Sequence, residues 1–528
     1  MRRRNVLLAI LAATLAAAPT SPAIAQLVPL GPETQVNTAA LHAFVGPVLA
    51  YDAGGGGELA VWTVLLRPDY SEVWARAFDL AGHPRGAERR IDTGSLVKHA
   101  PAVAARPGGG YAVVWINNQS PLATAGAVGG NGTVSLRLVG ADGVPAGAET
   151  QIDSAGGVDD GTSLRIAATT AGFVVSWAEL APTGGYDLIA RRFDAAGQPL
   201  GGEIAVGFEP VCPIADVALA GLADGGFAAI WNAGAGVSAT ASCPGFTARR
   251  FAADGRPAVP AFPVAAADLF AIRPDGSYLA VRNKPTPQQQ PFDSGYDVYA
   301  QLYDANGVPQ GAERRINSLL PHDQLATAAV AAVAAPNGGF LVVWSDDSAA
   351  TDDTVDADVF ARLLDSTGAP LAPEIVADSR TLGDQLAPQA AADGHGGWTL
   401  SWVSEAPGAS GGDLFLRLFA SCNGGACVAG RFRLDVAWRN PRDGSSGAGT
   451  AVALTADTTA FWFFAPANLE LMVKVLDGRG VNGHFWVFYG ALSDVEYTLT
   501  VTDTATGAQR AYHNPPFTLA SHADTQAF

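Results

Sequence analysis

The sequence predicts an all-β protein, a seven-bladed β-propeller closed by its own N-terminal strand and followed by a C-terminal antiparallel β-sandwich. Three observations carry this prediction. A four-strand unit recurs through most of the 528 residues, and the strand missing from its last copy stands near the start of the chain. After residue 428 the repeat gives way to short apolar runs without a common pattern, which marks a second domain.

Residues 1–25 have the features of a signal peptide. Arg2–Arg4 are positively charged, the apolar run 6–18 is too short to cross a bilayer, and Ala23-Ile24-Ala25 fits the small-residue cleavage rule. We therefore expect the mature chain to begin at Gln26 and to be secreted or periplasmic, without membrane insertion. A membrane anchor is the weaker alternative.

The repeated unit contains four short strands, which we call A to D. An alternating apolar run ends in tryptophan, a loop of variable length follows, and then come an Ala-Arg-x-Phe-Asp type strand, a tight Asp/Gly turn and a closing strand with glutamate. Period-two alternation indicates strands, and the glycine supplies the positive φ that tight hairpins need. Four strands in roughly 50 to 60 residues are typical of propeller blades. The strand-B runs end at Trp62, Trp115, Trp177, Trp231, Trp344 and Trp402, and in one copy at Arg282.

The last copy predicts how the ring closes. Its strand C, 414–419, leads into a cysteine loop at 421–427 with no strand D after it. The missing strand is found near the N-terminus, where Gly31-Pro-Glu-Thr-Gln-Val36 matches Gly147-Ala-Glu-Thr-Gln-Ile152. Pairing of that segment with the last blade would remove both open sheet edges. The propeller would then span residues 26–420.

The recurrent residues are expected to be mainly structural. Tryptophans at one blade position fill the space between neighbouring sheets. The aspartates that precede strand C are predicted to be local backbone caps; they are Asp187, Asp297, Asp358 and Asp413.

The B–C loops are the expected binding face, because they carry the length variation and share one face of the ring with the D–A connections. The variable loops are 117–133, 233–244, 283–296 and 345–355. Arg282, which breaks the tryptophan rule, is a candidate ligand-binding residue; sequence drift is the alternative. A glycan or protein ligand would bind here, to a protein expected to be a monomer.

One loop is strongly acidic and suggests a metal site. Crowded carboxylates repel one another, and Ca²⁺ with its oxygen ligands would relieve that repulsion. The spacing matches no EF-hand, and a solvated acidic loop is the alternative. The candidate ligands are Asp346, Asp347, Asp352, Asp353, Asp356 and Asp358.

Four cysteines in an exported chain suggest disulfides. Three pairings are formally open, and the local pairs Cys212–Cys243 and Cys422–Cys427 are preferred. A zinc site is the weaker alternative, since no C-x-x-C or histidine pair accompanies them.

Charge and motifs narrow the function. The formal net charge of -18 argues against nucleic acid and anionic membranes as partners. Residues 408–412 match G-x-S-x-G but lack the strand-to-helix elbow, and no metalloprotease, P-loop or dinucleotide motif occurs. These observations favour a non-catalytic binding or surface-interaction protein. Two alternatives stay open: a polysaccharide-active hydrolase or lyase with central-funnel carboxylates, and a structural envelope protein.

Two resemblances add to this interpretation. Residues 428–528, with Phe461-Trp-Phe-Phe464 and Asn482-Gly-His-Phe-Trp-Val-Phe488, resemble an accessory module of secreted Gram-negative bacterial proteins. The repeats resemble the Gly-Gly-Phe-x-Val-x-Trp repeats of large bacterial exoproteins and adhesins. The resemblance of residues 428–528 implies an accessory role for the C-terminal sandwich. The calcium-binding arrays that often accompany such repeats are absent from this sequence, which weakens the inference of calcium binding from the repeats.

Overall fold

The structure is a computed structural model that describes residues 27–528 apart from short gaps, and the expected signal peptide lies outside it. The gaps are residues 30–31, 39–42, 53–56, 68, 80–81, 119–131, 155–156, 159–162, 234–244, 286–295, 319–330, 336–337, 347–356, 380–382, 393–396, 406–411, 422–425, 429–430, 456, 504–505 and 507. The described part is built of strands with one short helix, α1 (Arg479–Asn482), so the all-β prediction is confirmed. None of the described helical segments is long and apolar enough to cross a membrane.

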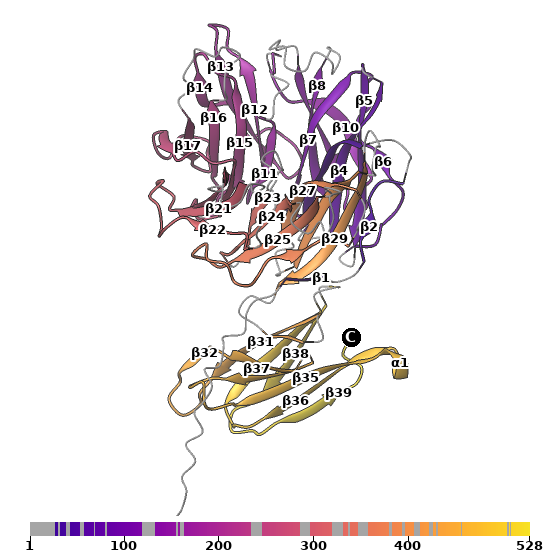
Figure 1. Cartoon of the computed structure of the whole chain (residues 1–528), viewed down its shortest axis with the longest axis vertical. Coiled ribbons are helices and arrows are strands. Elements are labelled where there is room, and N and C mark those ends of the chain that lie inside the picture. The colour runs from indigo at the N-terminus through magenta and orange to yellow at the C-terminus, as the bar shows by residue number, and fades with distance from the viewer. Residues whose placement is uncertain are drawn as a thin grey trace, which may run out of the picture.

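Seven antiparallel sheets make up the upper body in Figure 1; six are built from strands that follow one another in the chain, and the seventh also contains the N-terminal strands. Sheet 1 contains β3 (Ala43–Asp52), β4 (Gly57–Arg67), β5 (Tyr70–Asp79) and β6 (Arg89–Arg90); sheet 2 contains β7 (Val97–Ala105), β8 (Tyr111–Asn118), β9 (Thr133–Val139) and β10 (Pro145–Gln151); sheet 3 contains β11 (Arg165–Ala168), β12 (Gly172–Leu180), β13 (Tyr186–Asp194) and β14 (Ile204–Glu209); sheet 4 contains β15 (Ile214–Gly221), β16 (Phe227–Ala233), β17 (Phe246–Phe251) and β18 (Phe262–Val264).

The remaining three sheets continue the same order. Sheet 5 contains β19 (Leu269–Ile272), β20 (Tyr278–Pro285), β21 (Tyr296–Tyr303) and β22 (Arg314–Arg315); sheet 6 contains β23 (Ala331–Ala334), β24 (Phe340–Asp346), β25 (Asp358–Leu364) and β26 (Ile375–Val376); sheet 7 contains β27 (Gln385–Ala392), β28 (Gly397–Ser404) and β29 (Asp413–Ser421) with β1 (Leu27–Pro29) and β2 (Thr34–Gln35).

The N-terminal strands complete sheet 7, as the sequence predicted. Thr34 and Gln35 of β2 pair with Leu416 and Phe415 of β29, and the Val36 amide donates to the Leu414 carbonyl at 2.7 Å. Strand β1 pairs with the far half of β29, which the sequence did not foresee. The two chain ends of the repeat region are therefore joined by backbone hydrogen bonds.

The first strands of the sheets contact one another in a cycle. Strand β3 contacts β7, β7 contacts β11, and the series continues through β15, β19, β23 and β27 back to β3. A separate apolar cluster lies between each successive pair of sheets. The strand-B tryptophans belong to these clusters and are buried, which confirms their core role: Trp62, Trp115, Trp177, Trp231, Trp344 and Trp402.

The C–D turns follow the predicted chemistry. In sheet 3, Oδ1 of Asp194 accepts hydrogen bonds from the backbone amides of Ala196 and Gln198 at 2.9 and 2.8 Å. Gly197 then adopts a φ of 76°, which a residue with a Cβ rarely does. The turn is thus held by one aspartate oxygen and made possible by one glycine.

An arginine on strand C ties each of six sheets to the sheet before it. In every case a terminal nitrogen donates to a main-chain carbonyl oxygen in, or just after, strand D of the preceding sheet, as Arg191 does to Ile152 at 2.6 Å. The other five are Arg76, Arg137, Arg249, Arg362 and Arg417. Sheet 5 has Gln301 instead, whose amide bonds within its own sheet. The junction between sheets 4 and 5 therefore lacks this tie.

Two five-stranded sheets form the lower body in Figure 1 and share one apolar core. One contains β30 (Ala426–Val428), β31 (Phe432–Arg439), β32 (Ser446–Ala448), β37 (Glu496–Asp503) and β38 (Gln509–Asn514); the other contains β33 (Thr450–Thr455), β34 (Thr458–Trp462), β35 (Leu471–Gly478), β36 (His484–Ala491) and β39 (Ser521–Asp524).

Candidate functional site

One buried polar residue recurs just after strand D. Its side-chain oxygen accepts a hydrogen bond from the backbone amide near the start of strand C of the same sheet, 2.8 Å long from Val73 to Asp92 and from Val359 to Asp378. The equivalent residues are Asp153, Asn317 and Asn37. Sequence reasoning missed these caps, although an apolar residue, Asp or Asn, and Ser or Thr follow strand D in all five copies.

Two further positions flank each cap: the residue just before the capped amide near the start of strand C, and the residue two places before the cap. We call the cap and these two neighbours the polar cluster of the sheet. The clusters are Glu72, Arg90 and Asp92 in sheet 1; Thr133, Gln151 and Asp153 in sheet 2; Asp297, Arg315 and Asn317 in sheet 5; Asp358, Val376 and Asp378 in sheet 6; and Asp413, Gln35 and Asn37 in sheet 7.

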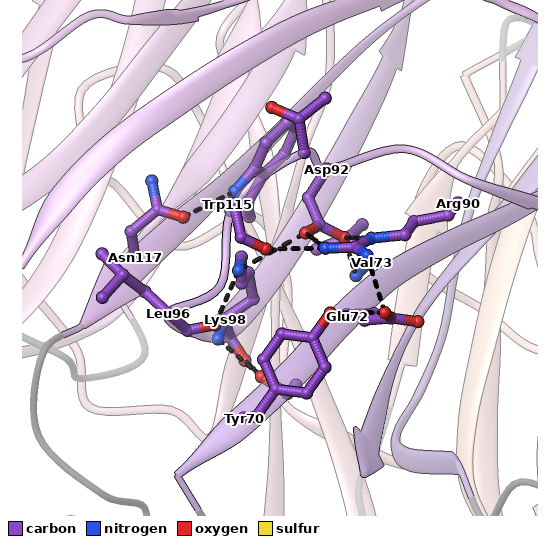
Figure 2. A network of polar contacts seen from close by, with 12 residues as sticks. Tyr70, Glu72, Val73, Arg90, Asp92, Leu96, Lys98, Trp115 and Asn117 are labelled. Atoms are coloured by element: carbon purple, nitrogen blue, oxygen red, sulfur yellow. Dashed lines mark hydrogen bonds and ion pairs between the residues drawn. The ribbon is translucent and has the colours of Figure 1, made fainter.

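In sheet 1 the cluster is fully charge-compensated (Figure 2). Arg90 bridges both carboxylates, with Nη1 at 2.8 Å from Oε1 of Glu72 and Nη2 at 2.7 Å from Oδ2 of Asp92. The ammonium of Lys98 lies 3.4 Å from the same Asp92 oxygen, and the phenol of Tyr70 donates to Glu72 at 2.6 Å. Each carboxylate therefore has at least two polar partners.

The burial of this network has electrostatic consequences. Lys98 has a fully buried side chain, and burial lowers its pKa while Asp92 opposes the shift. The pKa of Tyr70 is raised, first by burial and then by its hydrogen bond to Glu72. The hydrogen bond to Asp92 raises the pKa of Arg90 despite burial. Buried charges on both sides are thus held by each other, which is how proteins accommodate ions away from water.

In sheet 5 the acidic side chains also lie beside basic ones, and Arg282 is one of these. Asp297 accepts from the Asn317 amide at 2.8 Å and lies 3.6 Å from Arg315. Arg282 lies 3.1 Å from Glu313, which Lys284 also contacts. The proposed ligand role of Arg282 stays a prediction, and in this structure its side chain is in an ion pair.

The aspartates before strand C have side-chain partners where hydrogen bonds are described. Asp297 accepts from Asn317, and Asp413 accepts from Asn37 at 3.2 Å. The backbone amide beside each is bonded by the cap residue instead. The prediction that these aspartates are the backbone caps is therefore wrong for Asp297, Asp358 and Asp413, where the cap is the residue after strand D, and it stays a prediction for Asp187.

In sheet 6 the cluster contains two carboxyl groups and no basic residue, because valine stands where sheets 1 and 5 have arginine. Asp378 is 5% exposed, and its Oδ1 accepts from the Val359 amide. Its Oδ2 is buried with no hydrogen-bond partner in the described part of the chain. Burial raises the pKa of Asp378 to about 7, and the charge of Asp358 adds to that shift.

A third carboxyl group lies at the same end of sheet 6. Asp346 is the register partner of Asp358 across β24 and β25, and it accepts from the indole of Trp344 at 3.3 Å. Asp346 is buried, whereas Asp358 is partly exposed. Three acidic side chains thus gather at the end of this sheet where β24 leaves and β25 begins.

This gathering bears on the predicted calcium site. The structure brings together Asp346 and Asp358 from opposite ends of the acidic segment, but Asp347, Asp352, Asp353 and Asp356 lie outside the described residues. Within the described ranges no three Asp, Glu, His or Cys side chains are arranged to hold a metal ion. The calcium site stays a prediction.

Only one cysteine of each predicted disulfide is among the described residues. Neither Cys212 nor Cys427 is a free thiol. Their expected partners, Cys243 and Cys422, are not among the described residues, so the pairing stays a prediction.

The sheet 6 cluster has the elements of acid–base chemistry. A carboxyl group that stays protonated near pH 7 can donate a proton, and a neighbouring ionised carboxylate can accept one. The sheet 1 cluster does not offer this, since its carboxylates are bound by Arg90 and Lys98. The candidate site is therefore Asp358, Asp378 and Asp346.

No family model and no curated protein matches the chain. Among solved structures, a Dyadobacter fermentans protein of unknown function is 11% identical, with a TM-score of 0.39, and the match covers 75% of this chain and 99% of that one. A Penicillium chrysogenum α-L-arabinanase complexed with arabinobiose has 11% identity, a TM-score of 0.39 and coverages of 61% and 93%. An oligogalacturonate lyase in complex with manganese has 9% identity and a TM-score of 0.38, and the match covers 75% of this chain and 98% of that one.

These neighbours correct the functional prediction from the sequence. The two whose activity is named are an arabinanase and a lyase. Because this chain also assembles the carboxyl cluster of sheet 6, the preference for a non-catalytic binding or surface-interaction protein is corrected in favour of the hydrolase or lyase alternative. That preference depended on missing catalytic motifs, which cannot detect carboxyl groups assembled from separate strands. At TM-scores below 0.5 the likeness transfers no activity, and the alternative must be argued from this chain's own residues.

Proposed function

We propose that the protein is an exported glycoside hydrolase, built as a seven-bladed β-propeller with a C-terminal β-sandwich, and that Asp358 and Asp378 are its acid–base pair. The architecture is supported by the cycle of contacts among seven sheets and by the common core of the last two. Export is supported by the sequence features of residues 1–25.

The observation that carries the activity is the pair of carboxyl groups in the sheet 6 cluster, in which Asp378 is buried and Val376 takes the place that arginine has in sheets 1 and 5. Two interacting carboxyl groups share one proton near neutral pH and titrate as a pair. Hydrolysis of a glycosidic bond needs such a group, to protonate the leaving oxygen and then to recover a proton from water. A neutral polysaccharide is the expected substrate, since the net charge of -18 disfavours polyanions.

Asp358 is the member of the pair that reaches substrate, because it opens β25 and is partly exposed. The proton that Asp378 holds near pH 7 passes to Asp358, which gives it to the leaving glycosidic oxygen as the bond to the anomeric carbon breaks. Water then adds to that carbon, and its proton returns to Asp358. Asp378 is a positioning residue, buried behind Asp358, that keeps one proton on the pair at neutral pH.

The test is release of reducing ends from a panel of neutral polysaccharides by the full chain. Asp358→Asn should lower kcat at least about 100-fold, the usual contribution of a general acid. Asp378→Asn should lower kcat less, and it should move the alkaline limb of the pH–rate profile to lower pH because Asp358 then titrates alone. Asparagine is tolerated at this position, as Asn317 and Asn37 show.

The matched control is Asp153→Asn, which changes the equivalent cap in sheet 2 and should leave kcat and the pH profile unchanged. If no polysaccharide of the panel is cleaved, or if Asp358→Asn and Asp153→Asn behave alike, the hydrolase proposal fails.

A further inference from the structure

A pocket in the C-terminal sheets lies apart from the polar clusters. It is formed by the start of β36, the turn at α1, the β37–β38 hairpin and the residue before β31, and its volume is about 410 Å³. Sites for small molecules fall within this size range. The lining residues that matter here are Arg431, Arg479, Phe485, Asp503, Arg510 and Phe528.

The charge of this pocket departs from that of the whole chain. Arg431 is bound to Asp503 by two hydrogen bonds of 2.6 and 2.7 Å. Arg479 is bound in the same way to Asp477, at 3.0 and 2.8 Å. These two pairs cancel, and the third arginine is left over. Among the described side chains at the pocket, one positive charge is therefore left without a carboxylate partner, in a protein of net charge -18. The main-chain oxygen of Phe528 accepts a hydrogen bond from the Phe485 amide at 2.9 Å.

Arg510 supplies that surplus charge. It is exposed, and its described hydrogen bond goes from Nη1 to the Gln509 carbonyl at 3.3 Å. Within the described part of the chain it has no carboxylate partner. Its guanidinium lies 5.4 Å from the centre of the Phe528 ring, so the stack against that ring leaves other N–H donors for a ligand.

Aromatic rings form the apolar part of the pocket. Phe485 lies between two guanidinium groups, 4.7 Å from Arg431 and 4.5 Å from Arg479. Phe432 packs against both Phe485 and Phe528, with ring centres 4.8 and 5.2 Å apart. Rings fixed in this way offer a rigid apolar surface beside the free cation.

We propose that this pocket binds a uronic acid residue, with the carboxylate on Arg510 and a C–H face of the sugar ring on the Phe528 side. A planar carboxylate fits the fork of a guanidinium and needs only one compensating charge. A phosphate dianion would bring a second negative charge close to Asp503 and Asp477, and these carboxylates would repel it. This proposal does not depend on the hydrolase activity, since no residue of the sheet 6 cluster lines the pocket.

The test is titration calorimetry of the full chain with D-glucuronate and D-galacturonate. Their methyl esters keep the ring and remove the charge. One of the two acids should bind with a Kd in the millimolar range or below, and its ester at least ten times more weakly. Arg510→Gln should lower the association constant at least tenfold. Arg442→Gln, which changes an exposed arginine of the same sheets that does not line the pocket, should leave it unchanged.

Several results would overturn the proposal. These are absence of heat with both acids up to about 10 mM, equal binding of acid and ester, or unchanged binding by Arg510→Gln. Equal affinity for inorganic phosphate would show a general anion site and would also overturn it. Thermal melting of each variant shows that it is folded. Binding that persists in Asp358→Asn separates this site from the proposed catalytic one.

Discussion

Sheets 1 and 6 build the same polar cluster on the same backbone but surround its carboxyl groups with different charges. In sheet 1 an arginine and a buried lysine compensate Glu72 and Asp92. In sheet 6 the arginine position is Val376, and Asp378 has a buried oxygen with no hydrogen-bond partner among the residues that the structure describes. The cap hydrogen bond is identical in both, 2.8 Å to the backbone amide, so it does not explain the difference. The comparison shows that a repeat fixes the backbone role of a residue, whereas its neighbours decide its proton state.

We expect the largest loss of stability when a charge that compensates another is removed from the sheet 1 cluster. Asp92→Ala deletes the acceptor of the Val73 amide and leaves Lys98 buried without its nearest counter-charge. We expect the free energy of unfolding to fall by about 3–5 kcal/mol, as for a buried ion pair that loses one partner. Urea denaturation measures it. Asp153→Ala in sheet 2 deletes the same cap without a buried lysine and should cost less; equal costs would show that charge compensation is unimportant.

The pH dependence of stability tests the charge state of the sheet 6 cluster. The folded pKa of Asp378 is about 7, well above that of an unfolded aspartate, so the folded chain keeps a proton that the unfolded chain loses. The free energy of unfolding should therefore fall as the pH rises from about 4 to about 7, by on the order of 1.4 kcal/mol per pH unit from this group.

Asp378→Asn removes that contribution, and its unfolding free energy should be correspondingly less sensitive to pH over the same range. Denaturation curves at a series of pH values, compared with those of Asp153→Asn, measure the difference. Parallel curves for wild type and Asp378→Asn would show that Asp378 is ionised in the folded protein throughout.

Val376→Arg would convert the sheet 6 cluster into that of sheet 1. Val376 is 44% exposed, so a longer side chain has room, and Arg90 shows the geometry it could adopt. The new cation should stabilise both ionised carboxylates, raise the free energy of unfolding at pH 8 by about 1–2 kcal/mol, and lower kcat at least about tenfold. A variant with higher stability and unchanged kcat would argue against the acid–base pair.

The smallest effect concerns the ties between sheets. Arg191→Gln copies the exception at Gln301 and removes a 2.6 Å hydrogen bond to the Ile152 carbonyl. We expect a loss of about 1 kcal/mol in unfolding free energy, the usual net contribution of one hydrogen bond. Arg256→Gln provides the control, because Arg256 is exposed and its ion pair, 3.7 Å long, is with Asp254 of the same turn. A loss no larger than that of the control would show that the ties are dispensable.

The sequence predicted the strands of sheet 6 and the crowding of acids beside them, but not the site. Asp346 and Asp358 were singled out as metal ligands, and the register of β24 and β25 does place them opposite each other. Asp378 was not singled out, because it follows strand D of sheet 6. The spacing between Asp358 and Asp378 along the chain does not indicate that the two side chains meet. The recurrent Asp or Asn before Ser or Thr could have marked it.

By itself the sequence determined the repeat, the buried tryptophans and the pairing of the N-terminal segment with the last sheet, since alternation, turn residues and a matching fragment are local properties. Only the tertiary structure decided which charged groups meet. Asn37 bonds Asp413 across 376 residues, and Asp378 keeps its proton because burial and Asp358 both act on it. Burial and through-space charge depend on neighbours that the fold supplies, and these neighbours differ from one copy of the repeat to the next.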